Sequence, residues 1–426
     1  MTAAESPLDA VADRYVRLVL AAGRHDPDLV DAYYGPAQWK ADADSRAPVP
    51  LAALLAEADA LAAEVARVSP DGDDTDGLRR EYLAGQLAAV AARIRMLGGE
   101  RLGFDAESRA LYDAVAPTLP ERHFQDTLSA LDTLLPGPDD LPARVEAFRQ
   151  RHAIPVARLD GVFRAAIDEC RARTSRRIAL PADEVFDLEF VSGRPWSGYN
   201  WYQGRHRSLI QVNIELPIFI DRAIDLACHE GYPGHHVYNV LLERHLVEGR
   251  GWREFTVYAL FSPQSLIAEG TANFGIEVAF PAADRLAFEA DRLFPLAGLD
   301  PSDAPAYYEV LARLDALAYA GNEAARGYLD GRMTADQAVD WLVAYTLSSR
   351  PRAEQRIRFF DRYRSYVINY NLGKDLVRRH VEALGGTSAD PDRRWQVFGE
   401  LLSSPRLPSR LADNAECGMR SAECRE

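Results

Sequence analysis

The segment 229–236 has the sequence HEGYPGHH and contains three of the nine histidines of the chain, with Glu230 directly after the first. Neutral imidazole is a good ligand for Zn²⁺, and a glutamate beside a metal-bound water can accept its proton near neutral pH. In a His-Glu-x-x-His helix, two histidines four residues apart share one face. Here position 233 is a proline, and the next histidines are His235 and His236. The segment therefore predicts a metal site with altered spacing.

The altered spacing does not suit a regular helix. On such a helix His236 would face the same way as His229 but would lie roughly 10 Å further along the axis. Pro233 interrupts helical hydrogen bonding, and Gly234 permits an unusual turn. We expect a helix broken or bulged at this point, which returns a later histidine, either His235 or His236, to the metal. The alternative is a kinked helix that carries two surface histidines.

A third metal ligand is expected on a later helix. Glu269 and Asn273 are four residues apart and share one stripe, which continues to Glu277. Apolar neighbours predict a buried helix, and a buried carboxylate needs a partner such as a metal ion. Glu269 is the expected ligand and Asn273 a supporting residue, whereas a water-facing edge suits Glu277 better. Asp225 precedes His229 by four residues and is placed to orient its imidazole.

These motifs carry a resemblance to a known family. Residues 229–236 match the HExxPGHH signature of a bacterial family of unknown function, which resembles the largely helical zinc carboxypeptidases of the Taq type and, more widely, the gluzincins. An EGWALY-like segment of the family aligns with residues 269–274, where Thr271 replaces the tryptophan. A Tyr-x-x-Gly segment aligns with residues 370–373. The resemblance implies a mainly α-helical, two-lobed, gluzincin-like fold.

The resemblance also implies roles for the site residues. In gluzincins one helix supplies two histidines and the general base, and a later helix supplies a glutamate. By this pattern Glu230 is the base, and Tyr370 and the histidine that does not bind the metal are candidates to stabilise an oxyanion. Tyr363 and Tyr366, on the same predicted helix as Tyr370, rank below it. The expected Zn²⁺ ligands are His229, either His235 or His236, and Glu269.

Length and composition suggest two lobes within one compact unit. A chain of 426 residues, 47% of them hydrophobic, can bury a large core and exceeds one average domain. Helical patterns rich in alanine and leucine fill residues 1–180, and the composition changes after Pro181. We expect an N-terminal helical lobe over residues 1–180 and a lobe that bears the metal site over residues 181–426.

A small β-hairpin or sheet is expected near the metal site. Residues 185–192 and 208–214 are short, apolar and partly β-branched, and they flank a polar, aromatic loop at 193–207. An extended peptide can add to such an edge strand through its backbone. Arg205 or Arg207 in the loop is placed to bind a substrate carboxylate. The alternative is a solvated basic loop.

Charge and segment composition exclude several classes of partner. The formal net charge of −15 argues against nucleic acid and against anionic membranes. No stretch approaches twenty apolar residues, and the first residues lack a signal-peptide pattern, so a cytoplasmic protein is expected. The four cysteines are too scattered for a disulfide framework. Cys417 and Cys424 have the spacing to pair but are expected as free thiols.

The sequence therefore predicts a zinc-dependent hydrolase that cleaves a peptide or a related small amide. One alternative is a helical enzyme that uses iron or manganese, but such sites need a second Glu-x-x-His pair, which the chain lacks. Another is a non-catalytic binding or scaffold protein with a relict site. Retention of His229, Glu230 and Glu269 argues against decay of the site. The sequence leaves the exact substrate and the oligomeric state open.

Overall fold

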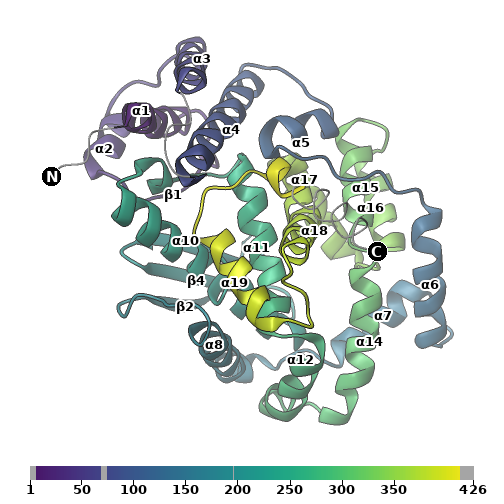
Figure 1. The fold of residues 1–426 in the computed structure, drawn as a ribbon. Helices are drawn as coiled ribbons and strands as arrows, with labels where there is room; N and C mark the ends of the chain where they lie inside the picture. Colours follow the sequence, from purple (N-terminus) through teal and green to yellow (C-terminus); the bar gives the residue numbers. More distant parts are fainter. Residues whose placement is uncertain (1–5, 69–73, 195, 413–426) are drawn as a thin grey trace, which may run out of the picture.

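The computed structural model describes residues 6–68, 74–194 and 196–412 and shows a mainly α-helical chain with two small sheets (Figure 1). The expected fold class, mainly helical with a small β element, is confirmed. Among the described helices, none has the length and apolar character needed to cross a membrane. Cys417 and Cys424 lie outside the described residues.

The elements have the following bounds. The α-helices are α1 (Pro7–Ala22), α2 (Ala37–Ser45), α3 (Leu51–Arg67), α4 (Asp74–Leu97), α5 (Phe104–Tyr112), α6 (Arg122–Leu134), α7 (Leu141–Gln150), α8 (Leu159–Ser175), α9 (Asp221–Leu226), α10 (His235–Leu242), α11 (Pro263–Ala279), α12 (Ala282–Phe288), α13 (Phe294–Ala297), α14 (Ala304–Asp315), α15 (Ala320–Leu329), α16 (Ala335–Tyr345), α17 (Arg350–Tyr363), α18 (Ile368–Ala383) and α19 (Pro391–Leu402). The strands are β1 (Val30–Tyr33), β2 (Val185–Val191), β3 (Gly198–Gly204), β4 (Arg207–Asn213) and β5 (Val257–Ala259). Two shorter segments matter for the site: the π-helical η2 (Ala227–Gly231) and the 3-10 helix η7 (Arg364–Val367).

The larger sheet has the strand order β2-β4-β3, with β2 parallel and β3 antiparallel to β4. A tight turn at Arg205-His206 joins β3 to β4, and both residues have positive φ, 54° and 56°. This conformation suits the twist of a hairpin. The aromatic stretch expected as a loop is therefore mostly strand β3. Its side chains alternate between faces, with Trp201 exposed and Tyr202 buried.

The smaller sheet was not expected from the sequence. Strand β1, near the N-terminus, pairs antiparallel with β5, which lies just before α11. The register shifts between Val30 and Ala32, so Asp31 occupies a β-bulge. This pairing brings β1 against the segment that leads into helix α11.

Helix α11 is central to the molecule (Figure 1). Pro263 occupies its first turn, where a missing N–H removes no helical hydrogen bond. The helix is buried on nearly all faces, which explains why its sequence is apolar around the whole circumference. Ile267 and Phe274 belong to one hydrophobic cluster and Leu266 to the other. Each cluster contains residues from before and after position 181.

Two glycines allow α11 to cross α18 closely. A Cβ atom on Gly270 would lie 2.5 Å from the carbonyl carbon of Gly373, and one on Gly373 would lie 2.8 Å from the carbonyl oxygen of Leu266. Only glycine fits at such an approach of two backbones. Glu269 precedes Gly270, and Tyr370 lies one turn before Gly373. The crossing therefore places the tyrosine-bearing segment against the expected ligand.

Candidate metal centre

The helix that carries His229 is broken where the sequence predicts. Helix α9 continues into the π-helical η2, and α10 begins afresh at His235. The N–H of Gly234 donates to the carbonyl of Cys228 at 2.9 Å, and a Cβ atom on Gly234 would lie only 1.9 Å from the carbonyl oxygen of His229. The chain can fold back this tightly because position 234 is glycine. As a result, Nε2 of His235 lies 3.1 Å from Nε2 of His229.

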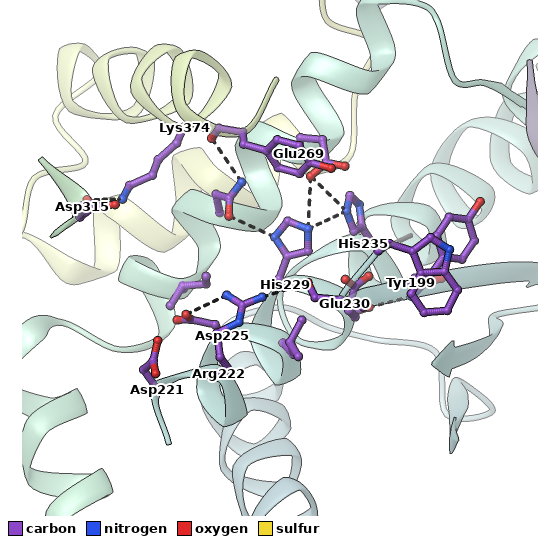
Figure 2. Close-up of a pocket in the computed structure, with 18 of the residues that line it drawn as sticks. Tyr199, Asp221, Arg222, Asp225, His229, Glu230, His235, Glu269, Asp315 and Lys374 are labelled. Atoms are coloured by element: carbon purple, nitrogen blue, oxygen red, sulfur yellow. Dashed lines mark hydrogen bonds and ion pairs between the residues drawn. The ribbon is translucent and has the colours of Figure 1, made fainter. Parts of the chain in front are cut away.

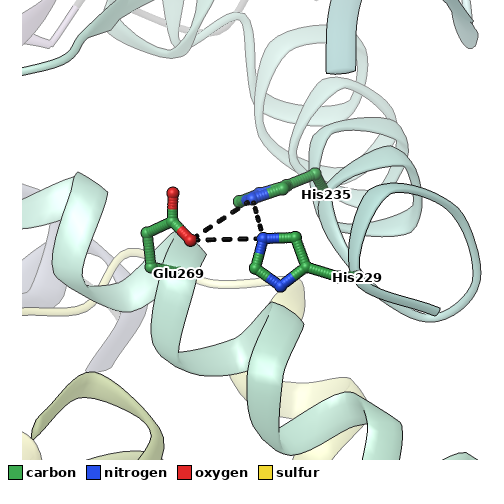
Figure 3. Close-up of side chains that lie close together, drawn as sticks. All are labelled: His229, His235 and Glu269. Carbon is green, nitrogen blue, oxygen red and sulfur yellow. Dashed lines mark hydrogen bonds and ion pairs between the residues drawn. The ribbon is translucent and has the colours of Figure 1, made fainter. Parts of the chain in front are cut away.

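Three side chains converge at this break (Figure 3). Oε2 of Glu269 lies 3.2 Å from Nε2 of His229 and 3.8 Å from Nε2 of His235. The three donor atoms all lie within 4.8 Å of one another. Burial alone would raise the pKa of Glu269, but the two histidines hold that pKa well below its ordinary value. Glu269 Oε2 is buried and receives no well-aligned hydrogen bond, as expected of an atom that a cation would complete.

Hydrogen bonds from α11 and from η7 hold these candidate ligands in place. Oδ1 of Asn273 lies 3.2 Å from Nδ1 of His229, which leaves Nε2 facing Glu269. The Asn273 amide in turn donates to the backbone carbonyl of Tyr370 at 3.2 Å. The hydroxyl of Tyr366 donates to Oε1 of Glu269 at 2.9 Å. Asn273 therefore lies next to His229, in the supporting position expected of it. Tyr366, which ranked below Tyr370 from the sequence alone, is the tyrosine that contacts the carboxylate of Glu269.

Asp225 does not have the expected role beside His229. Its carboxylate pairs with Arg285 at 2.9 Å. It also pairs with Arg222 at 3.1 Å (Figure 2). These arginines hold the pKa of Asp225 below its ordinary value, although burial alone would raise it. The spacing of four residues fails here because the helix changes to π geometry at residue 227, and Asn273 from α11 occupies the place next to the imidazole instead.

His236 points away from the other candidate ligands. Its side chain is fully buried, with Nε2 at 2.9 Å from Oε2 of Glu184 and Nδ1 at 2.9 Å from Oγ of Ser208. Glu184 also accepts a hydrogen bond from the hydroxyl of Tyr232 at 2.6 Å. These contacts tie the break to strand β4 and to the start of β2. The structure thus brings His235, and not His236, to His229 and Glu269.

Glu230 lies beside this cluster on the wall of a cavity. Its side chain is 5% exposed, and burial, with a further contribution from the charge of Glu269, raises its pKa to about 7. Strand β3 packs directly against it. The amide of Asn200 donates to the Glu230 carbonyl at 2.6 Å, and a Cβ atom on Gly198 would lie 2.7 Å from Oε1. Glu230 is thus buried, titratable near neutral pH and adjacent to the three donor atoms.

The cavity has a volume of about 1570 Å³ and lies between β1, β3, α11, α17 and α18. Arg205 and Arg207 do not line it. They lie at the turn of the hairpin, where the Arg205 N–H donates to Glu243 and Arg207 lies 3.6 Å from Asp187. The expected carboxylate-binding role is therefore not supported for either, because β3 lines the cavity from Gly198 to Tyr202 and the hairpin turn lies beyond these residues. The arginines that do line the cavity are Arg149, Arg222, Arg285, Arg352, Arg356 and Arg394.

One acidic residue of the cavity was missed by sequence reasoning. Asp31 lines it from strand β1 and accepts a hydrogen bond from the hydroxyl of Tyr199. Burial raises the pKa of Asp31 to about 6, while the hydrogen bond from Tyr199 opposes that increase. The segment around it contains Pro27, Gly35 and Pro36, which are typical of a loop rather than of a strand. No local pattern marks Asp31, because its neighbours in the site come from distant parts of the chain.

Comparison with known proteins supports the fold. No family model and no curated protein matches the chain, so the family suggested by residues 229–236 is not established. A candidate lipoprotein from Colwellia psychrerythraea matches 97% of this chain and 76% of its own, with 14% identity and a TM-score of 0.52. An M32 carboxypeptidase from Deinococcus radiodurans matches 96% of this chain and 93% of its own, with 13% identity and a TM-score of 0.48. A candidate lipoprotein of unknown function from Shewanella oneidensis matches 89% of this chain and 76% of its own, with 14% identity and a TM-score of 0.46. The chain shares its overall fold with the Colwellia protein.

Proposed function

We propose that this protein is a zinc-dependent hydrolase of peptide or related amide bonds. The observation that carries the proposal is the convergence of two imidazole Nε2 atoms and one carboxylate oxygen, on a cavity wall, beside the buried Glu230. Two histidines and one glutamate are a donor set that Zn²⁺ uses in hydrolases, with a further coordination position left for water or substrate.

The residues present fit a metal ion. His229 and His235 would each bind it through Nε2, and Glu269 through Oε2, the oxygen that receives no well-aligned hydrogen bond. When bound, Zn²⁺ lowers the pKa of a water molecule and polarises a substrate carbonyl. Asn273 fixes the tautomer in which His229 presents Nε2 as the donor atom, and Tyr366 holds the second oxygen of Glu269.

Glu230 is the proposed general base. Its carboxylate lies in the cavity next to the ligands, and its pKa of about 7 lets it accept a proton and release it again near neutral pH. In this role it takes a proton from the attacking water and delivers it to the leaving amine. Strand β3 covers its other side, so the carboxylate is held in position and shielded from bulk water.

Tyr370 is the proposed donor to the oxyanion. Among the described residues its hydroxyl has no hydrogen-bond partner, and it lines the cavity, whereas the hydroxyl of Tyr366 is already bound to Glu269. Burial raises the pKa of the Tyr370 phenol well above its ordinary value, so it remains a proton donor at neutral pH. The guanidinium of Arg356 lies 5.7 Å from the centre of the same ring.

Metal analysis and a peptide digest test the proposal together. Protein purified without chelator should contain one equivalent of zinc and should cleave members of a peptide library, as read by mass spectrometry. Removal of the metal should abolish cleavage, and added Zn²⁺ should restore it. One equivalent of iron or manganese would favour a different helical metalloenzyme. Absence of both metal and cleavage would favour a scaffold protein.

A further inference from the structure

The β-bulge of strand β1 directs Asp31 into the cavity. The register of the strand pair shifts between Val30 and Ala32, which leaves Asp31 without a partner on β5. Bulges of this kind re-aim a side chain and are frequent beside active sites. Asp31 lines the same cavity as His235 and Glu230. An acidic side chain is therefore placed near the proposed metal site by a part of the chain that supplies none of the ligands.

The carboxylate of Asp31 is only half satisfied. The hydroxyl of Tyr199 donates to Oδ1, while Oδ2 has no donor and no arginine or lysine forms an ion pair with Asp31 in the part of the chain that the structure describes. Asp28, another acid on this cavity wall, differs because both of its oxygens are bound by Arg362, at 2.6 and 2.8 Å. Asp31 is half-buried and lines the cavity, so a cationic group bound there can pair with the open oxygen of its carboxylate.

The surrounding side chains suit an organic cation. The ring of Tyr199 stacks on that of Trp196, with centroids 5.4 Å apart, and meets Trp201 at 4.5 Å. Tyr258, on β5, also lines the cavity, and the charge of Asp31 is, after burial, the largest cause of its raised phenol pKa. Aromatic faces attract ammonium groups through their quadrupoles. Figure 2 shows Tyr199 on the His235 side of the site.

A metal ion fits this position less well than an amine. Zinc sites use at least three protein ligands, and within the described residues only His229, His235 and Glu269 form such a group of His, Cys, Asp or Glu side chains. An ammonium group instead donates up to three hydrogen bonds and needs one carboxylate with an open oxygen. A peptide with a free N-terminus carries such a group at neutral pH.

We propose that Asp31 binds the free α-amino group of a short peptide substrate. This inference rests on the proposed hydrolysis of peptide bonds and narrows its substrates to peptides with an unblocked N-terminus. Asp31 is then a specificity-determining residue, supplied by the N-terminal segment through the pairing of β1 with β5.

Peptide binding tests the role of Asp31 without relying on turnover. The probes are Ala-Ala-Ala and its N-acetylated form, which differ in the charge of the amino group. Calorimetry at pH 7 would measure their binding to zinc-loaded full-length protein carrying Glu230→Gln, which should hydrolyse neither. We expect the free peptide to bind at least about tenfold more tightly, the effect of one charge-assisted hydrogen bond. Adding Asp31→Asn should remove this preference and leave binding of the acetylated peptide within about threefold.

A matched variant separates charge from structure. Asp28→Asn changes a neighbouring acid that already has an arginine partner and should retain the preference for the free peptide. Equal binding of the two peptides, or no binding of either, would overturn the inference, as would an equal loss for both in Asp31→Asn. A protein that shows the preference but never cleaves peptides would instead contradict the proposed hydrolysis.

Discussion

Gly234 lets His235, and not His236, reach His229 and Glu269. Its lack of a side chain lets the chain fold back over the end of η2, with 1.9 Å between a would-be Cβ and the His229 carbonyl oxygen. This return places His235 beside His229, while the next residue, His236, turns toward Glu184. His235 therefore faces the cavity, whereas the adjacent His236 is packed in the core.

The two histidines should respond differently to replacement by alanine. His235→Ala removes a donor atom of the cluster and should weaken zinc binding by more than about 100-fold, since even loss of an outer hydrogen-bond partner costs 10–100-fold. His236→Ala removes a fully buried side chain and one of the hydrogen-bond partners of Glu184, and should lower stability by about 2 kcal/mol while zinc binding remains. Zinc titration and urea unfolding of both variants check this. The reverse pattern would make His236 the ligand.

Glu269 and Glu277 offer a second matched pair on one helix. Glu269→Ala should reduce zinc affinity strongly, because it removes the only carboxylate of the donor cluster. Glu277→Ala should leave affinity nearly unchanged, because Glu277 pairs with Lys374 at 3.1 Å and with Arg378. Competition with a fluorescent zinc chelator measures both. Unchanged affinity in Glu269→Ala would remove Glu269 from the ligand set.

Glu230 should impose the acidic limb of the pH profile. Burial raises its pKa to about 7, and a zinc ion beside it would lower that pKa again. We expect kcat/KM to fall tenfold per pH unit once the pH is below the pKa of Glu230 in the zinc-loaded protein. Glu230→Gln should retain one equivalent of zinc, lose activity at least about 100-fold and lose this limb from any residual rate. Loss of zinc from this variant would show that Glu230 is a ligand.

At the scale of the element, the crossing of α11 and α18 holds the site together. Glu269 and Asn273 belong to α11, and Tyr370 lies in the first turn of α18. The backbones touch at Gly270 and Gly373, so the crossing fixes how far the tyrosines stand from the ligands.

The close crossing predicts that one added methyl group at position 270 lowers the stability of the protein. Gly270→Ala would place a Cβ 2.5 Å from the backbone of Gly373, which must shift, and should lower stability by about 1–3 kcal/mol. Gly321→Ala, in helix α15, has no atom within 4 Å of the added Cβ and should be neutral or slightly stabilising. Denaturant midpoints of the two variants compare them directly. Equal midpoints would mean that the helices adjust without cost.

At the scale of the whole molecule, the site joins parts of the chain that are far apart in sequence. Strand β1 contributes Asp31, η2 and α10 contribute the histidines, and α11, η7 and α18 contribute the remaining groups. A ligand that binds only this assembled arrangement stabilises the whole fold by mass action.

Metal removal should therefore lower the melting temperature. At a free zinc concentration 100 times Kd, binding stabilises the folded state by about 2.7 kcal/mol, and a chelator removes this contribution. Differential scanning calorimetry with and without chelator measures the shift. The matched control is His229→Ala, which lacks a ligand and should melt at the same temperature in both conditions. A chelator-induced shift of equal size in this variant would place the stabilising metal elsewhere.

What the sequence determined by itself is local. The 3.6-residue period made the chain helical, proline and glycine at 233–234 predicted the break, and the four-residue spacing on one buried helix selected Glu269 and Asn273. These inferences hold because they depend on residues within one or two turns of each other. The choice between His235 and His236 stayed open, because it depends on the angle at which the chain leaves the break.

Only the tertiary structure decided which distant groups meet. Asp31 and Tyr199 are 168 residues apart, and Tyr366 reaches Glu269 across 97. Asp225 lost its expected partner because two arginines attract it, one of them from α12. Arg205 and Arg207 lie at the turn between β3 and β4 and do not line the cavity, and the sequence did not predict strand β3. Such contacts depend on strand pairing and helix crossing, where packing of many side chains selects the geometry, so no local pattern in the chain encodes them.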